Sequence, residues 1–188
     1  MPDVVTVLCV LRSGGPYTPE YVERLRDGVA AHLSGHRFVC LSDVSVPNRI
    51  PLHHDWPGWW SKIEVFRIPG PVLYFDLDTV ITGDISGIAR YPHRFTMLTD
   101  FMRPDRAASG VMAWGGDWSR LYTEFDPGAK YPGHGDQGYV ESKVDADRFQ
   151  DLFPRQIVSR KVRRTRNPNE RVVCFHGSPR PAEVGWQV

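Results

Sequence analysis

Two aspartates separated by one residue are the clearest chemical signal in the sequence. An apolar run over residues 72–75 leads directly into Asp76-Leu77-Asp78. Residues i and i+2 of a strand point to the same face, so the two carboxylates are expected to lie side by side. Adjacent carboxylates repel unless a cation lies between them, and their oxygens suit Mg²⁺ or Mn²⁺ that also binds phosphates. The pattern predicts a metal and diphosphate site, against the simpler interpretation that Asp78 caps a turn.

Three further segments could complete such a site. His176 follows another apolar run and could add a nitrogen ligand that favours Mn²⁺ over Ca²⁺, although a single strand-end histidine is more often structural. Asp136-Gln137 places an acid and an amide where sugar hydroxyls or a reacting centre could be bound; helix capping would explain the Asp but not the Gln. Lys62, close to three tryptophans, could reach a diphosphate or could extend along an aromatic core patch.

The elements expected to position these residues alternate between strand and helix patterns. This alternation predicts an α/β fold with right-handed crossovers and a mixed, mostly parallel sheet flanked by helices. Thr18 and Asp117 are expected to cap two of the helices. The strands are predicted over residues 4–11, 38–41, 72–75, 95–98, 110–114 and 172–175, and the helices over 19–33, 59–66, 117–125 and 136–143.

Length and composition limit the classes of function. The 188 residues, 41% of them hydrophobic, favour a single domain over residues 1–188. A formal net charge of +1 gives no field that would attract nucleic acid, and no apolar stretch is long enough for a transmembrane segment. The N-terminus lacks the pattern of a signal peptide, and the three cysteines lie in apolar runs, so a reducing cytoplasmic setting is expected. The basic run over 160–166 is interpreted as a solvated loop, with a phosphate or acceptor contact as the alternative.

Four elements, taken in order, resemble glycosyltransferase family 8 and related small bacterial glycosyltransferases of the GT-A fold. Residues 58–66 resemble the family's aromatic-x-Lys/Arg helix, and residues 73–78 its Asp-x-Asp strand. Asp136-Gln137 and the segment 175–181 are similar to its Asp-Gln and His-Gly-x-x-Lys-Pro elements. Two positions depart from the pattern: Ala108 replaces the usual Asn, which removes a hydrogen bond expected to the donor sugar, and Arg180 replaces Lys.

The resemblance implies a metal-dependent hexosyltransferase that moves a sugar from a nucleotide-diphosphate donor, with UDP as the expected carrier, to an acceptor such as a glycan, a lipid-linked sugar or a protein. It also implies retention of anomeric configuration. A nucleophilic carboxylate and a same-face displacement both remain open. The implied roles are Mn²⁺ or Mg²⁺ binding by Asp76, Asp78 and His176; donor and diphosphate binding by Lys62, Asp76, Ser109, Gly110, Gly177 and Arg180; contact with the base by Leu11, Arg12 and Tyr17; and catalysis by Asp100, Asp136 and Gln137.

Two other functions fit parts of the pattern. A haloacid-dehalogenase-like phosphatase also begins its first motif with a strand followed by Asp-x-Asp-x-Thr, which Asp76 and Asp78 would supply here. That family starts near its nucleophile strand, whereas some 75 residues precede it in this chain. A non-catalytic nucleotide-sugar binding module would explain the missing Asn at position 108. Release of nucleoside diphosphate from a donor distinguishes the module from the enzyme.

Overall fold

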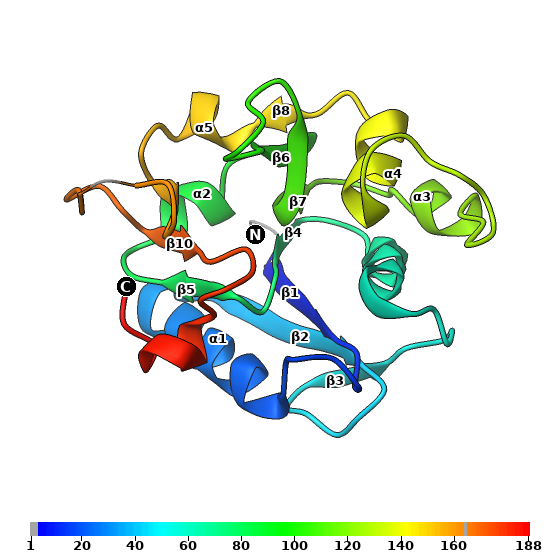
Figure 1. Ribbon diagram of the computed structural model, residues 1–188, viewed down its shortest axis with the longest axis horizontal. Helices are drawn as coiled ribbons and strands as arrows, with labels where there is room; N and C mark the ends of the chain where they lie inside the picture. The colour runs from blue at the N-terminus through cyan, green and yellow to red at the C-terminus, as the bar shows by residue number, and fades with distance from the viewer. Residues whose placement is uncertain (1–3, 164) are drawn as a thin grey trace.

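The computed structural model describes residues 4–163 and 165–188, so Arg164 of the basic run lies outside the described residues. A seven-stranded sheet in the order β3-β2-β1-β4-β7-β6-β8 runs through the molecule (Figure 1). Its strands are β1 (Val5–Leu11), β2 (His36–Ser42), β3 (Arg49–Pro51), β4 (Val72–Phe75), β6 (Phe95–Thr99), β7 (Ala107–Trp114) and β8 (Asp147–Arg148).

The pairing of these strands confirms a mixed, mostly parallel sheet. β1 pairs in parallel with β2 and β4, β2 with β3, and β6 with β8. The strand β7 is antiparallel to both of its neighbours, β4 and β6. Because β7 runs against β4, the middle of β7 lies beside the end of β4, where the Asp-Leu-Asp segment begins.

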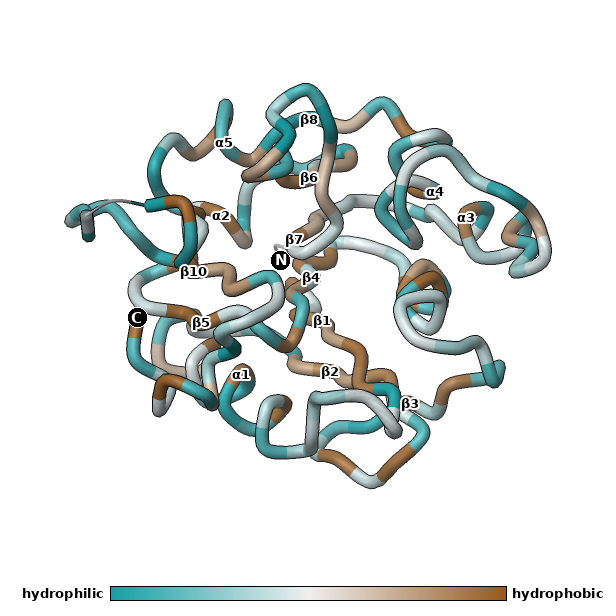
Figure 2. The backbone as a smooth tube through the Cα atoms, in the orientation of Figure 1, coloured by the Kyte–Doolittle hydropathy of each residue, from teal (hydrophilic) through white to brown (hydrophobic). Residues whose placement is uncertain are grey.

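Both faces of the sheet are covered, which explains the nearly continuous apolar runs in its central strands. In β4, Leu73 and Phe75 belong to the core on the face covered by α1 (Pro19–His32). Val72 and Tyr74 belong to the core on the opposite face, with residues of η1 (Gly58–Arg67) and α4 (Gly135–Lys143). Figure 2 shows the hydrophobic colouring concentrated along the strands. Asp76 continues the alternation of Val72 and Tyr74 and therefore points toward η1 and α4.

A second, three-stranded sheet, in the order β5-β10-β9, lies beside the first near α1 (Figure 1). It consists of β5 (Thr79–Ile81), β9 (Ile157–Ser159) and β10 (Val172–Cys174). The remaining helices are short: α2 (Ser86–Ala89), α3 (Arg120–Thr123), α5 (Phe149–Leu152) and the 3₁₀ helix η2 (Pro181–Val184).

Several details of the predicted elements were wrong. The helix predicted over 59–66 is confirmed as part of η1, and it is of the 3₁₀ type. The helix expected over 117–125 is only the short α3; Asp117 accepts a hydrogen bond from the Ser119 amide in a turn before it. Thr18 is the residue before α1, but its side chain makes no capping hydrogen bond. The three cysteines are buried free thiols, as expected. Within the described residues, no helix is long and apolar enough to cross a membrane.

His93 gives the fold an expected dependence on pH. Its Nε2 lies 2.8 Å from the carbonyl oxygen of Ile88 and its Nδ1 2.7 Å from Thr96 Oγ1. A neutral ring satisfies both contacts by donating from Nε2 and accepting at Nδ1, and burial lowers the pKa of His93 from its usual value.

As the pH falls through the ordinary histidine pKa of about 6.5, His93 is protonated more readily in the unfolded chain than in the folded chain. We expect His93 to contribute full stability above that pH and to lose part of it below. In urea unfolding at pH 7.5 and pH 5, His93→Gln should be less stable than wild type at pH 7.5 and show a smaller loss on acidification. An equal loss in both proteins would contradict this role.

Candidate active site

A turn between the two sheets separates the two aspartates. The Thr79 amide donates a hydrogen bond to the carbonyl oxygen of Asp76, 3.1 Å away, and β5 then begins at Thr79. Asp76 still extends the edge of β4, because its amide donates to the carbonyl oxygen of Gly110 at 2.8 Å. The expectation that both carboxylates would share one strand face was therefore wrong. Asp76 faces η1 and α4, whereas Asp78 faces Tyr17 and the segment after β10.

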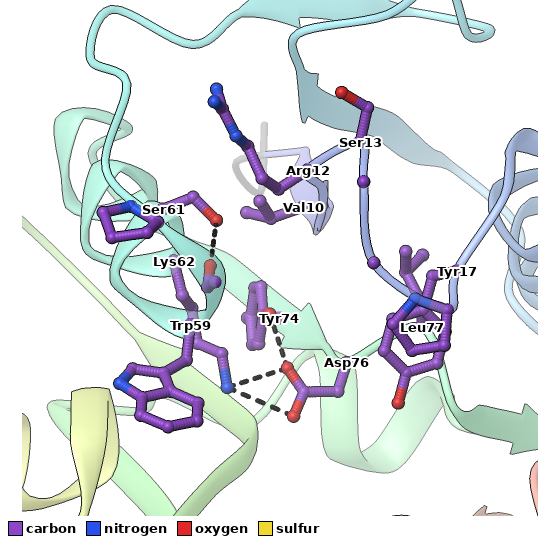
Figure 3. Close-up of a pocket in the computed structure, with 15 residues that line it drawn as sticks. Val10, Arg12, Ser13, Tyr17, Trp59, Ser61, Lys62, Tyr74, Asp76 and Leu77 are labelled. Carbon is purple, nitrogen blue, oxygen red and sulfur yellow. Dashed lines mark hydrogen bonds and ion pairs between the residues drawn. The ribbon is translucent and has the colours of Figure 1, made fainter.

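Lys62 joins three elements at the Asp76 side of the site. Its ammonium lies 2.8 Å from Asp76 Oδ1, 3.0 Å from Asp136 Oδ2 and 3.1 Å from Ser109 Oγ. Ser109 in turn donates a hydrogen bond to Asp136 Oδ2 at 2.5 Å, and Tyr74 donates one to Asp76 Oδ1 at 2.6 Å. Figure 3 shows Lys62 reaching the Asp76 carboxylate from η1. We call Lys62, Asp76, Ser109 and Asp136 the lysine cluster.

The charges in the lysine cluster perturb the pKa values of its members. Desolvation raises the pKa of Asp76 to about 6, assisted by Asp78 and Asp136 and opposed by Lys62. Desolvation alone would lower the pKa of Lys62, but the carboxylates of Asp136 and Asp76 outweigh it and raise the pKa above its ordinary value. Burial, with the Asp76 carboxylate nearby, raises the pKa of Tyr74, so its hydroxyl remains a donor. One cation thus holds two carboxylates together in a recessed site.

On the other side, Asp78 connects the first loop of the chain to the C-terminal segment. Its Oδ2 accepts a hydrogen bond from the Tyr17 hydroxyl at 2.9 Å and lies 3.4 Å from the amide of Gly177. Its backbone carbonyl accepts from the Phe175 amide at 3.0 Å. His176 follows with a positive φ of 38°, an uncommon conformation that turns the chain at this point. The strand end of β10 is thereby fixed beside the Asp-Leu-Asp turn.

His176 is oriented by contacts on two sides. Its Nε2 lies 2.6 Å from Ser159 Oγ, and its ring stacks on Phe101 with centroids 5.5 Å apart. Burial, with the nearby Lys161 ammonium, lowers the pKa of His176 from its usual value. The ring is therefore neutral at pH 7, which is the form that can bind a metal.

The lysine cluster borders a cavity of about 300 Å³. Asp100 and Gln137, which were predicted to be catalytic with Asp136, also line this cavity. Gln137 Nε2 donates to Asp100 Oδ2 at 3.2 Å, and Asp100 forms an ion pair with Arg103 at 2.9 Å. These hydrogen bonds outweigh desolvation and lower the pKa of Asp100, so it is a carboxylate at neutral pH. We call this the sugar cavity; its lining includes Trp59, Lys62, Asp76, Asp78, Asp100, Phe101, Ala108, Ser109, Gly110, Asp136, Gln137 and His176.

A register shift in β7 brings Ser109 and Gly110 to this cavity. Met112 pairs with Met97 of β6, but the next β6 residue, Leu98, pairs with Ala108. The intervening residues 109–111 have no partner on β6, although Val111 pairs with β4. Bulges of this kind redirect side chains beside functional sites. Ser109 can therefore reach Lys62 and Asp136.

A larger cavity of about 520 Å³ adjoins the first loop and shares Trp59, Lys62 and Asp76 with the sugar cavity. Arg12 and Tyr17 line it, together with the glycines between them (Figure 3). Arg12 forms ion pairs with Asp43, at 3.6 Å, and with Asp55. We call this the loop cavity. The two cavities meet at the lysine cluster.

The predicted site residues occupy different positions relative to the two cavities. Leu11 is buried in the core and lines neither cavity, whereas its neighbour Val10 lines the loop cavity. Arg180 lines neither; it pairs with Glu183 at 3.2 Å and lies over the Tyr17 ring, with 5.8 Å from Cζ to the centroid. Gly177 contacts the site through its amide alone. In this structure Lys62 contacts carboxylates, so its contact with a diphosphate remains a prediction.

Sequence reasoning missed the contributions of Tyr74 and Trp59. Tyr74 was taken only as part of a buried strand, yet its hydroxyl holds Asp76. The i, i+2 relation of the two residues was the available signal, because both point to the same face of the strand. Trp59 was named only as a neighbour of Lys62, with an aromatic core patch as one of two interpretations, but 62% of its surface is exposed.

The donor set can be compared with the requirements of a divalent cation. Asp76, Asp78 and His176 line the sugar cavity and offer two carboxylates and a neutral imidazole, a set that suits Mn²⁺ or Mg²⁺. Among the described residues, however, no three His, Cys, Asp or Glu side chains are close enough together to hold a metal ion. Asp76 is engaged by Lys62 and Tyr74, and Asp78 by Tyr17. The ligand types fit, and side-chain rearrangement is needed to bring them together.

Comparison with solved structures identifies the fold. The chain superposes on the bifunctional glycosyltransferase WbbM with a TM-score of 0.66 and 12% identity, covering 96% of this chain and 47% of WbbM. The apo form of glycosyltransferase GlyE from Streptococcus pneumoniae TIGR4 gives 0.63 and 12%, with coverages of 95% and 56%. The galactosyltransferase LgtC, solved with donor and acceptor sugar analogues, gives 0.59 and 11%, with coverages of 94% and 88%.

The chain has the GT-A glycosyltransferase fold. It spans about half the length of WbbM and GlyE and most of the length of LgtC. No family model and no curated protein sequence matches it. The GT-A fold confirms the expected architecture and agrees with the resemblance to family 8. At these levels of identity, the likeness establishes the fold, and the chemistry must be argued from the site.

Proposed function

We propose that this GT-A protein is a metal-dependent glycosyltransferase that uses a nucleotide-diphosphate sugar, with UDP as the expected carrier. The observation that carries the proposal is that Lys62 and Asp76 of the lysine cluster line both the loop cavity and the sugar cavity. A nucleotide sugar has two parts joined by a diphosphate. The two adjoining cavities, with charged groups where they meet, correspond to that arrangement.

The donor would extend from the loop cavity to the sugar cavity. The base and ribose would lie against residues 12–17, and the sugar would lie over Asp100, Asp136 and Gln137. The diphosphate would cross the Asp-Leu-Asp turn, where the Gly177 amide and Arg180 approach from the C-terminal segment. Arg180 reaches this region only after releasing Glu183, an exposed pair that costs little to break.

The side chains would act through charge. Negative charge develops on the leaving diphosphate during transfer, and Arg180 and Lys62 are the cations placed to stabilise it. Positive charge develops on the sugar ring, and the carboxylates of Asp136 and Asp100 would stabilise that charge. Lys62 also keeps Asp136 and Asp76 in place. We propose retention of configuration, without choosing between a nucleophilic carboxylate and a same-face displacement.

Asp76, Asp78 and His176 would hold Mn²⁺ or Mg²⁺. The bound ion would supply Lewis-acid stabilisation of the leaving group. Tyr17 must then release Asp78 Oδ2 or share it. Burial, with the Asp78 carboxylate beside it, raises the pKa of Tyr17, so its hydroxyl keeps its proton in the present arrangement.

The phosphatase alternative fits the fold less well, because the chain has the GT-A fold. The contacts of Asp76 do not distinguish the two functions. Lys62 contacts both of its oxygens and Tyr74 donates to one, so Asp76 would have to leave these contacts to attack phosphorus, as it would to bind a metal. A nucleotide-sugar binding module would have the same geometry as the enzyme. The two are distinguished by whether the donor is turned over.

The proposed function is tested by incubating the purified protein with a panel of nucleotide sugars and Mn²⁺ and measuring nucleoside diphosphate release. We expect slow release from one donor, abolished by a chelator and reduced about a hundredfold or more by Asp78→Asn. Asp84→Asn, which removes an exposed carboxylate in a turn outside both cavities, is the matched control and should leave release unchanged. Metal-dependent donor binding without release would favour the binding module.

A further inference from the structure

Trp59 is an exposed aromatic side chain at the boundary of the two cavities. It retains 62% of its surface, and it lines both the loop cavity and the sugar cavity. A single exposed aromatic side chain is common on protein surfaces, but Trp59 lines two adjoining cavities, where its ring can contact a bound ligand. The neighbouring Trp60, in contrast, packs on Phe125 with a centroid distance of 5.0 Å. The exposure of Trp59 is thus not shared by the adjacent tryptophan.

The helical period of η1 explains this position. A 3₁₀ helix has three residues per turn, so Trp59 and Lys62 lie on the same side, one turn apart. Figure 3 shows the indole beside the Lys62 ammonium, where Lys62 meets Asp76. The side of η1 that places Lys62 in the lysine cluster therefore also places an exposed indole where the two cavities adjoin.

Gly135 at the start of α4 leaves room for this indole. A Cβ atom at residue 135 would lie 2.7 Å from Trp59 Nε1, closer than nonbonded atoms approach. Gly135 also has a φ of +52°, which disfavours other residues. The indole is therefore seated against α4, immediately before the Asp136-Gln137 pair.

The surroundings of Trp59 match the two kinds of surface on a sugar ring. One face of a pyranose presents C–H groups, which pack on an aromatic ring, and its edges present hydroxyls. Trp59 and Phe101 supply aromatic surface in the sugar cavity, and Asp100, Asp136 and Gln137 supply hydrogen-bond acceptors and donors. The polar groups of these three side chains suit a ligand that carries hydroxyls better than an apolar lipid chain, which offers them no hydrogen bonds.

We propose that Trp59 is the stacking platform for a pyranose ring of the acceptor, so that the acceptor is a saccharide. This inference rests on the proposed function: with a nucleotide sugar across the lysine cluster, the donor occupies the inner parts of both cavities. The exposed indole at their junction then faces the side from which a second molecule reaches the transfer point.

The test is a ¹H–¹⁵N NMR titration in the presence of UDP and Mg²⁺, with lactose, maltose, cellobiose and N,N′-diacetylchitobiose as probes. Trp59→Phe identifies the indole resonance of Trp59 by its loss. We expect at least one disaccharide to shift that resonance saturably, and Trp59→Ala to weaken its binding about tenfold or more, as typical for loss of an aromatic contact. UDP affinity should change by less than about twofold. Tyr91→Ala, an exposed aromatic outside both cavities, should change neither affinity.

Two results would overturn the inference. The first is that no disaccharide shifts the Trp59 resonance. The second is that Trp59→Ala weakens UDP as much as the saccharide, which would make Trp59 a wall of the nucleotide site. The proposed function can fail independently of this inference. If a saccharide binds at Trp59 but the protein neither binds UDP nor turns over any donor, the carbohydrate site would stand and the glycosyltransferase function would be rejected.

Discussion

Lys62→Met is expected to lower kcat for donor turnover by about a hundredfold to a thousandfold, the usual cost of losing a preorganised charge in an active site. The ammonium contacts Asp76, Asp136 and Ser109 together. Its removal leaves two carboxylates facing each other, with the Asp136 side chain only 9% exposed. We also expect a loss of about 3 kcal/mol in the free energy of unfolding, because an uncompensated buried charge remains.

The matched control for this substitution is Lys143→Met. Lys143 pairs with Glu124 at 3.8 Å, and both side chains are substantially exposed. Surface pairs of this kind contribute less than about 1 kcal/mol. Urea unfolding and donor-release assays on the two variants therefore separate the site from a general effect of removing a lysine. A Lys62→Met protein with wild-type kcat would contradict the role assigned to the lysine cluster.

Asp136→Asn is expected to reduce kcat by about a hundredfold while leaving the KM for the donor within a few-fold of wild type. The amide has nearly the shape of the carboxylate and can still accept a hydrogen bond from Ser109, whose hydroxyl lies 2.5 Å from Asp136 Oδ2. What it removes is the negative charge beside the sugar cavity. That charge stabilises the positive charge that develops on the sugar ring in the transition state, so its loss should lower kcat more than it raises KM.

Glu141→Gln makes the same chemical change on the same helix, outside both cavities. Glu141 pairs with Arg106 at 2.8 Å and accepts a hydrogen bond from the Ala107 amide. It should cost stability while leaving kcat near the wild-type value. Steady-state kinetics with the donor found in the panel assay decide the comparison. A rise in KM with unchanged kcat in Asp136→Asn would instead assign Asp136 to ground-state binding.

The central strands could be predicted from the sequence because both of their faces are buried. The alternating sides of β4 pack into two cores, so nearly every residue is apolar and the segment stands out. The strands β3, β5, β8 and β9 were missed. Each has two or three residues, and their conformation depends on pairing with distant segments such as β10, which local sequence does not reveal.

The site was predicted in its parts and not in its arrangement. Asp76 and Lys62 were both assigned to a charged site, and the structure places them in contact. The hydrogen bond from the Thr79 amide to the Asp76 carbonyl turns the chain after Asp76. Because Asp78 lies in this turn and not in the strand, the alternation of side chains along a strand does not predict its direction. The position of Ser109 depends on a register shift between β6 and β7, and that of Trp59 on a 3₁₀ rather than an α-helical period.

The most direct test of the proposed donor site is a crystal structure of the protein with UDP and Mn²⁺. We predict the uracil in the loop cavity near Arg12, the diphosphate at the Asp-Leu-Asp turn, and an anomalous Mn²⁺ peak bound by Asp76, Asp78 and His176. Density for UDP outside both cavities, or Mn²⁺ bound away from Asp78, would contradict a nucleotide-sugar site built on the lysine cluster.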